Sequence, residues 1–180
     1  MLAKVNVWRI VKTHLRTLRR YDSGRPAVSD WFTFLVLPVI LSIALSACLD
    51  IRSSDAINSL ITVLSILAGF SFNLLAIIFG YQGKIKRAIG PKDKAKKQYI
   101  REIHGNISFS VLNALLCILL LLLLKTELKV TLPSFTLGQV DVSGIELVEL
   151  ITFFLLSFYA LTLLMIIKRL SILFEHDEQA

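Results

Sequence analysis

Four long apolar runs place the first constraint on how this chain folds. They cover residues 31–49, 56–81, 106–124 and 147–168. A helix needs roughly 20 such residues to cross a hydrocarbon core of about 30 Å. Backbone groups in lipid must be satisfied within a helix or a closed barrel, and these runs lack strict alternation. The sequence therefore predicts an all-α membrane protein with four transmembrane helices.

The composition supports this prediction. Hydrophobic residues make up 55% of the 180-residue chain, whereas a soluble domain is usually about 45–50% apolar. Cys48 and Cys117 both lie in apolar runs, and neither has a second cysteine or a histidine at ligand spacing. We therefore expect no disulfide framework, no zinc site and no cofactor.

The distribution of charge predicts the orientation of the spans. The net charge is +7, from 20 Lys and Arg residues. Seven of these lie in residues 1–30, eight in residues 82–105 and two at 168–169, against three in the remaining loops. Because basic loops stay on the cytoplasmic side, both termini are predicted to be cytoplasmic. Much of the positive charge is then a topology signal.

One alternative concerns the first apolar run. Residues 45–48, LSAC, match the short motif that precedes a lipid-modified cysteine in bacterial lipoproteins. However, the basic segment 1–30 is long for the start of a signal peptide, and Pro38 interrupts the run. We therefore interpret residues 31–49 as a retained membrane span.

The segment 1–30 contains a predicted amphipathic helix over residues 2–20, followed by a turn. Its apolar residues recur at steps of three and four, and they are Val5, Trp8, Val11, Leu15 and Leu18. Such a helix either lies in the membrane interface beside anionic headgroups or docks a cytoplasmic partner. Both interpretations stay open at this point.

The predicted cytoplasmic loop 82–105 is also basic. Gly90-Pro91 breaks it, and the following residues are expected to form a basic helix that leads into the third span. No aromatic interleaving or known module indicates sequence-specific nucleic-acid binding. The predicted lipid- or partner-binding residues of both segments are Arg16, Arg19, Arg20, Lys84, Lys86, Arg87, Lys92, Lys94, Lys96, Lys97 and Arg101.

Two further segments lie outside the predicted spans. Residues 125–146 form the larger outer loop, where alternation around LKVTL and GQVDV indicates a short hairpin. Residues 169–180 extend the fourth helix past the bilayer and end in an acidic tail. Glu146 and Glu149, near the outer end of the fourth span, are weak candidates for a cation site.

The second span carries a stripe of small and polar residues. At 100° per residue, its members fall within a sector of about 80°: Asn58, Thr62, Ser65, Gly69, Asn73, Ala76 and Gly80. Small residues permit close backbone approach between membrane helices, and polar side chains add hydrogen bonds. This stripe is therefore a predicted helix-packing or oligomer face.

Depth suggests that the stripe belongs to a wider polar layer. Asn73, Asn113 and Pro38 each lie seven residues from the cytoplasmic end of their span, about 10 Å deep by helix rise. Pro38 frees the carbonyl of Phe34, for which an asparagine amide is a plausible donor. The layer is interpreted either as an ordinary packing seam or as a polar constriction at an oligomer axis.

Catalytic motifs are missing from the sequence. The three histidines, His14, His104 and His176, form no zinc-type motif, and there is no nucleotide-binding loop or nucleophile elbow. We therefore predict that the protein is not an enzyme. Two classes remain: a membrane platform or sensor that recruits a soluble partner, and a pore that permeabilises the membrane.

The architecture resembles a known group of proteins. The basic amphipathic leader, the four spans with both ends inside and the segment 65–81, SILAGFSFNLLAIIFGY, are similar to small membrane proteins of bacterial anti-phage defence operons, the membrane subunits of Kiwa systems among them. The resemblance implies a homo-oligomeric sensor in the bacterial inner membrane that holds a soluble cytoplasmic effector. It assigns no residue of this chain a role.

Overall fold

The computed structural model describes six parts of the chain: residues 7–17, 32–49, 51–85, 91–126, 135–137 and 140–178. Side chains within 82–85, 91–95, 135–137, 140–142 and 175–178 are not considered. Some residues singled out from the sequence therefore lie outside the described residues. They are Val5 and Leu18 of the predicted apolar face, and the predicted binding residues Arg19, Arg20, Lys86 and Arg87.

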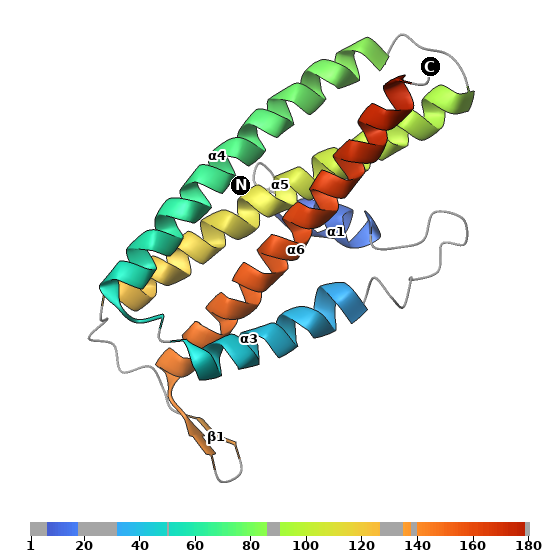
Figure 1. Cartoon of the computed structure of the whole chain (residues 1–180). Helices are drawn as coiled ribbons and strands as arrows, with labels where there is room; N and C mark the ends of the chain where they lie inside the picture. Colours follow the sequence, from blue (N-terminus) through green and yellow to red (C-terminus); the bar gives the residue numbers. More distant parts are fainter. Residues whose placement is uncertain are drawn as a thin grey trace, which may run out of the picture.

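Three long helices run side by side, with α5 (Pro91–Lys125) between α4 (Ser54–Ile85) and α6 (Gly144–Glu178) (Figure 1). Among the described residues, these three are long and apolar enough to cross a membrane. The described part of the chain is thus all-helical apart from one short hairpin, as predicted, and three of the four predicted spans form helices long and apolar enough to cross a membrane.

The first apolar run forms a shorter rod. A π-helical segment, η2 (Phe32–Val36), leads into α3 (Leu37–Cys48), which packs on α6. Together they measure about 25 Å at 1.5 Å per residue, less than a hydrocarbon core of about 30 Å. That this run also crosses the membrane stays a prediction.

Pro38 explains why the rod begins irregularly. It is buried in the first turn of α3, directly after η2. A proline ring removes the donor for the carbonyl of Phe34 and collides with that carbonyl. The chain widens into a π-turn just before it, and such turns are often found at functional sites.

The basic segment 82–105 is mostly helical. α4 continues to Ile85 and α5 begins at Pro91, where a proline is favourable because the first helical N–H needs no partner. The predicted basic helix after Gly90-Pro91 is confirmed, whereas residues 82–85, predicted as loop, continue α4. Residues 86–90, between the two helices, lie outside the described part of the chain.

Helix α6 begins with a reciprocal cap. The backbone N–H of Ser143 donates to a Glu146 carboxylate oxygen at 3.0 Å, and the Glu146 N–H donates to the Ser143 hydroxyl at 3.3 Å. Before it, strands β1 (Phe135–Leu137) and β2 (Val140–Val142) pair antiparallel. The predicted hairpin is therefore present, with VDV of the GQVDV segment as its second strand. Residues 138–139 and the LKVTL segment lie outside the described residues.

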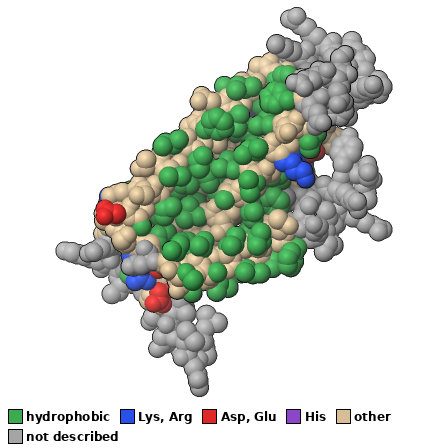
Figure 2. Space-filling view, viewed as in Figure 1, with side chains coloured by type: hydrophobic (Ala, Val, Ile, Leu, Met, Phe, Trp, Pro, Cys, Tyr) green, Lys and Arg blue, Asp and Glu red, His purple; other side chains and the backbone are tan. Residues whose placement is uncertain are grey.

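The hydrophobic core follows the seams of the three long helices. Buried residues form two clusters, one around Leu64, Cys117 and Phe153 and one around Ile78, Ile103 and Ile166. Figure 2 shows hydrophobic side chains over the middle of one face, with acidic and basic side chains near its two ends. This banding is the pattern expected of a protein that crosses a bilayer.

Candidate functional site

Helix α1 (Val7–Thr17) docks on the bundle through polar side chains. Its fully buried residue is His14, whose Nδ1 lies 3.0 Å from Oδ1 of Asn106 on α5. The Thr17 hydroxyl lies 2.9 Å from the same Oδ1 and 2.7 Å from the His14 carbonyl oxygen. Because the amide oxygen only accepts, Nδ1 of His14 carries the proton in this arrangement.

An arginine from α6 completes this junction. Arg169 donates to a Glu102 carboxylate oxygen at 3.2 Å and to the Thr17 carbonyl at 3.0 Å. Thr17 is the last residue of α1, where unsatisfied carbonyls give the helix end a partial negative charge. Arg169 therefore links the end of α1 to α5 and α6 at once.

A glycine permits the close approach of α1 to α5. A Cβ built on Gly105 would lie 2.7 Å from Cγ2 of Thr13. Carbon atoms at ordinary contact are about 3.5–4.0 Å apart, so any larger residue at 105 forces the two helices apart.

The imidazole of His14 sits in an aromatic enclosure. It stacks on Phe109 with ring centroids 4.1 Å apart and meets Phe158 edge-on at 5.8 Å. Burial lowers the pKa of His14 from 6.5 to about 4; the hydrogen bond with Asn106 opposes this shift and the positive charge of Arg169 adds to it. His14 is therefore neutral near pH 7.

Two polar atoms of this junction have no partner within the described part of the chain. Nε2 of His14 and Nδ2 of Asn106 are buried there without a hydrogen bond. Each such atom normally costs free energy, since buried polar groups are almost always satisfied. The junction is thus specific in its geometry but incompletely satisfied.

A small cavity lies beside His14, where α1, η2, α5 and α6 meet. Its volume is about 230 Å³, and its lining consists of Val11, His14, Leu15, Phe34, Leu35, Phe109, Phe154, Leu155 and Phe158. His14 is the one polar side chain among these nine. The cavity is therefore lined by both the π-helical segment η2 and the end of α1 that carries the buried His14.

The stripe on α4 faces away from the rest of its own chain. All seven of its residues are exposed, and added Cβ atoms on Gly69 and Gly80 would meet nothing within 4 Å. The seam of α4 against α5 is formed by another face, which includes Ile57, Leu64, Ala68, Ser71 and Ile78. Among the described residues, packing within the chain therefore engages the stripe only at Asn58, whose side chain contacts Lys125 of α5.

Hydrogen bonding distinguishes Asn73 from the other polar members of the stripe. The hydroxyls of Thr62 and Ser65 donate to carbonyls one turn earlier in α4, which satisfies them without a neighbour. Asn58 accepts from Lys125 at 2.7 Å. No described residue hydrogen-bonds the amide of Asn73. This residue lies in the uncharged stretch of α4 between Asp55 and Lys84.

The predicted polar layer is divided between two environments. Asn113 is buried and donates to the Leu155 carbonyl of α6 at 3.1 Å, so its acceptor is in α6 rather than at Phe34. Pro38 is a buried residue of α3. Asn73 lies on the exposed face of α4, so these three residues do not form one continuous contact layer within the chain.

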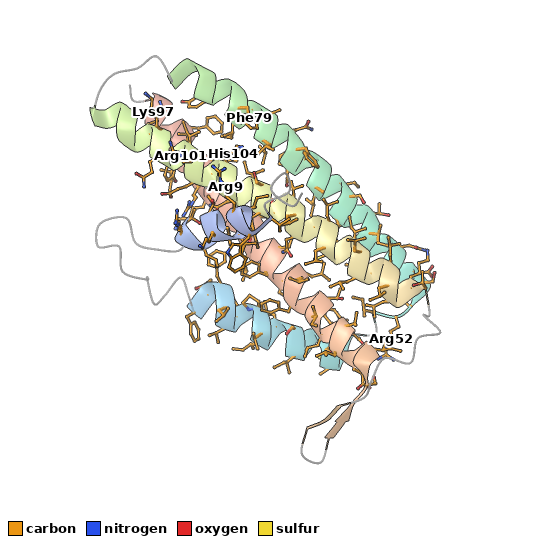
Figure 3. The ribbon with its side chains drawn as sticks, turned by 180° about the vertical axis from the view of Figure 1, so that it is seen from behind. Arg9, Arg52, Phe79, Lys97, Arg101 and His104 are labelled. Atoms are coloured by element: carbon orange, nitrogen blue, oxygen red, sulfur yellow. The ribbon has the colours of Figure 1, made fainter. Side chains whose placement is uncertain are left out.

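Four of the predicted basic residues have described side chains. Arg16 and Arg101 are exposed, and Lys96 and Lys97 are half-buried. The ammonium of Lys96 lies 5.4 Å from the ring centroid of Tyr81 on α4. Lys97 and Arg101 follow one another along α5 near α1 (Figure 3). The side chains of Lys84, Lys92 and Lys94 lie outside the described set.

The two outer carboxylates are engaged within the chain. Glu149 is buried and pairs with Arg52 at 3.1 Å, while Glu146 caps α6. Both line an open groove of about 680 Å³ beside the end of α3. Among the described residues, no three His, Cys, Asp or Glu side chains gather as metal ligands would.

Sequence reasoning did not find the α1 junction. His14, Asn106 and Arg169 are far apart in sequence, and neither the histidine nor the arginine belongs to a motif. One signal was present: Thr13, His14 and Thr17 recur at helical spacing on α1, as polar residues on a face separate from the basic one.

Comparisons with known proteins return no match: no family model, no curated protein and no solved structure is similar to this chain.

Proposed function

We propose that this protein is a non-enzymatic platform or sensor of the bacterial inner membrane, plausibly in anti-phage defence, that homo-oligomerises and recruits or regulates a soluble cytoplasmic effector. In this proposal α3 also crosses the membrane, and both termini are cytoplasmic. The positive-inside bias of the sequence supports that orientation. The assignment to defence rests on the architectural resemblance alone.

The observation that carries the proposal is the exposed stripe of α4. A polar amide facing lipid is costly because hydrocarbon offers it no partner. On either side of Asn73 the stripe has small residues, and they permit a second helix to approach closely. A second copy of the chain, presenting the same face, supplies both the amide partner and the close packing.

The bare surface of α4 also supports assembly. Only 22% of its most apolar window is buried within the chain, against 39% for the corresponding windows of α5 and α6. α4 is an edge helix that packs mainly on α5 (Figure 1). It is therefore the long helix with the most surface left for a neighbour.

Oligomeric state tests this proposal. Native mass spectrometry of the purified chain in a mild detergent should show a homo-oligomer. Asn73→Leu should weaken association by about 0.6–2 kcal/mol per contact, or about 3- to 30-fold. Phe72→Leu is the matched control, because Phe72 is exposed on the same helix outside the stripe. A monomeric wild-type chain would contradict the proposal.

Recruitment of an effector is tested separately, through the basic cytoplasmic surface. The chain is co-expressed with any soluble protein whose gene adjoins its own, and the pair is co-purified. Replacing Lys94, Lys96 and Lys97 by Glu should abolish co-purification if acidic surfaces of the partner bind there. Unchanged recovery of the partner would count against this surface as the docking site.

A pore is the second candidate, and the same stripe favours it. Thr62, Ser65 and Asn73 face away from their own chain, so around an oligomer axis they would line a polar path. Purified protein in liposomes discriminates the two functions. Ion flux without a companion protein, reduced by Asn73→Leu, supports the pore, whereas sealed liposomes support the platform.

A further inference from the structure

The cavity beside His14 opens toward the outside of the bundle. Two of its lining residues, Leu15 on α1 and Leu35 on η2, are 39% and 50% exposed. They belong to the two elements that meet over the cavity. The opening is therefore framed by apolar side chains on a surface that is itself apolar.

Water is a poor occupant of this space. A buried water needs about two to four polar partners, whereas His14 is the one polar side chain of the lining and, with its Nδ1 bonded to Asn106, offers at most its Nε2. An empty cavity would deprive its walls of dispersion contacts. Hydrocarbon is thus the chemistry that fits.

The size and position of the cavity narrow the occupant further. About 230 Å³ is below the roughly 300–1,000 Å³ of pockets for drug-sized ligands, so the cavity suits the end of one chain. Phe109 and Phe158 line it from the uncharged stretches of α5 and α6. A chain within the bilayer therefore has direct access to it.

Basic side chains on α1 bear on the headgroup of the lipid that occupies the cavity. Lys12 and Arg16 directly follow the lining residues Val11 and Leu15, and both side chains are exposed. Basic residues at a membrane surface attract anionic headgroups. The chain thus places an apolar cavity and two cations on adjacent positions of the same short helix.

We propose that this cavity binds one acyl chain of an anionic membrane phospholipid, with its headgroup at Lys12 and Arg16 and its chain end against Phe34 and Phe158. The lipid fills the space between α1 and η2. Because the docked α1 provides one wall of the cavity, the bound lipid stabilises the docked helix.

Photocrosslinking of the full chain in nanodiscs tests the proposal. The probe is a phosphatidylglycerol with a diazirine at the end of one acyl chain, and labelled peptides are mapped by mass spectrometry. Labelling should concentrate on the cavity residues of η2 and α6. The corresponding phosphatidylcholine probe, which has no net charge, should label them at least about tenfold less, since two cations favour an anionic headgroup.

Two variants separate the cavity from general lipid contact. Leu35→Trp fills the mouth and should reduce cavity labelling about tenfold, while Ile40→Trp adds the same bulk at an equally exposed position of α3 that does not line the cavity. Lys12→Gln with Arg16→Gln should remove the preference for phosphatidylglycerol. Equal labelling of both tryptophan variants, or equal labelling by the phosphatidylglycerol and phosphatidylcholine probes in the wild type, would overturn the proposal.

Discussion

Helices α1 and α4 meet the bundle in opposite ways. α4 packs on α5 with apolar residues and leaves its small and polar stripe exposed. α1 packs with His14 and Thr17 and leaves Trp8 65% exposed. In water the arrangement of α1 would be unfavourable, since apolar surface is exposed and polar groups are buried. In lipid the exposed polar stripe of α4 is the unfavourable feature, because hydrocarbon offers it no hydrogen-bond partner.

A membrane setting accounts for the difference. At the interface, the exposed apolar face of α1 contacts lipid while its basic face remains near the headgroups. Within the bilayer, lipid is as apolar as the side chains, so helices associate through small and polar residues. The comparison indicates that α1 packs against its own chain, whereas the stripe of α4 remains available to pack against a second copy.

Low pH should release α1 most strongly. Burial lowers the pKa of His14 to about 4, and the undocked helix has the ordinary value of about 6.5. Protons therefore bind the undocked state more tightly, so docking is strongest above pH 6.5 and weakens as the pH falls toward 4. The full loss is about 3 kcal/mol.

The docked fraction of α1 is measured as the distance between spin labels at Val7 and Ile167, both exposed, with Cys48 replaced by serine. The control is His14→Gln, which retains a hydrogen-bonding side chain without this titration. Glu102 and Arg169, the charged groups of the junction, are unchanged in that control. A pH response as large in His14→Gln as in the wild type would contradict the assignment.

Arg169→Gln should have the next largest effect. It removes the charged bonds to Glu102 and to the Thr17 carbonyl, at 3.2 and 3.0 Å. The Arg169 side chain is only 16% exposed, so docking of α1 should weaken by about 2 kcal/mol. The same spin-label distance measures it, with Lys168→Gln as the neighbouring control. An unchanged docked fraction would show that the junction does not depend on this arginine.

Gly105→Ala should weaken docking by about 1–2 kcal/mol through its contact with Thr13. The gain in helix propensity from glycine to alanine is present in docked and undocked states alike, so it cancels. Gly69→Ala is the matched control on α4, where an added Cβ has free space. If both substitutions leave α1 equally docked, close packing at Gly105 is not required.

Asn113→Leu should have the smallest effect. It removes one hydrogen bond to the Leu155 carbonyl, 3.1 Å long, and such bonds in membrane proteins average about 0.6 kcal/mol. Unfolding of the purified chain in mixed detergent micelles measures the change. A loss above about 3 kcal/mol would mean that Asn113 does more than join α5 to α6.

The sequence predicted the features that depend on local pattern. Apolar runs marked α4, α5 and α6, and Gly90-Pro91 marked the start of α5. The α1 junction was not predictable in this way, because it joins His14, Asn106 and Arg169 from three distant segments. Helical period placed Asn73 on the stripe of α4, but only the fold shows that this face is bare.

The most direct test of the central claim is a cysteine scan of α4 in native membranes. In a background without Cys48 and Cys117, single cysteines are placed from residue 62 to residue 80 and cross-linked. We predict that dimeric products peak at the stripe positions Ser65, Gly69 and Asn73 and fall at Val63 and Phe70, which are exposed about 100–120° away around the helix. Cross-linking without this periodicity, or with its peaks at Val63 and Phe70, would contradict the claim that copies of the chain meet through the stripe.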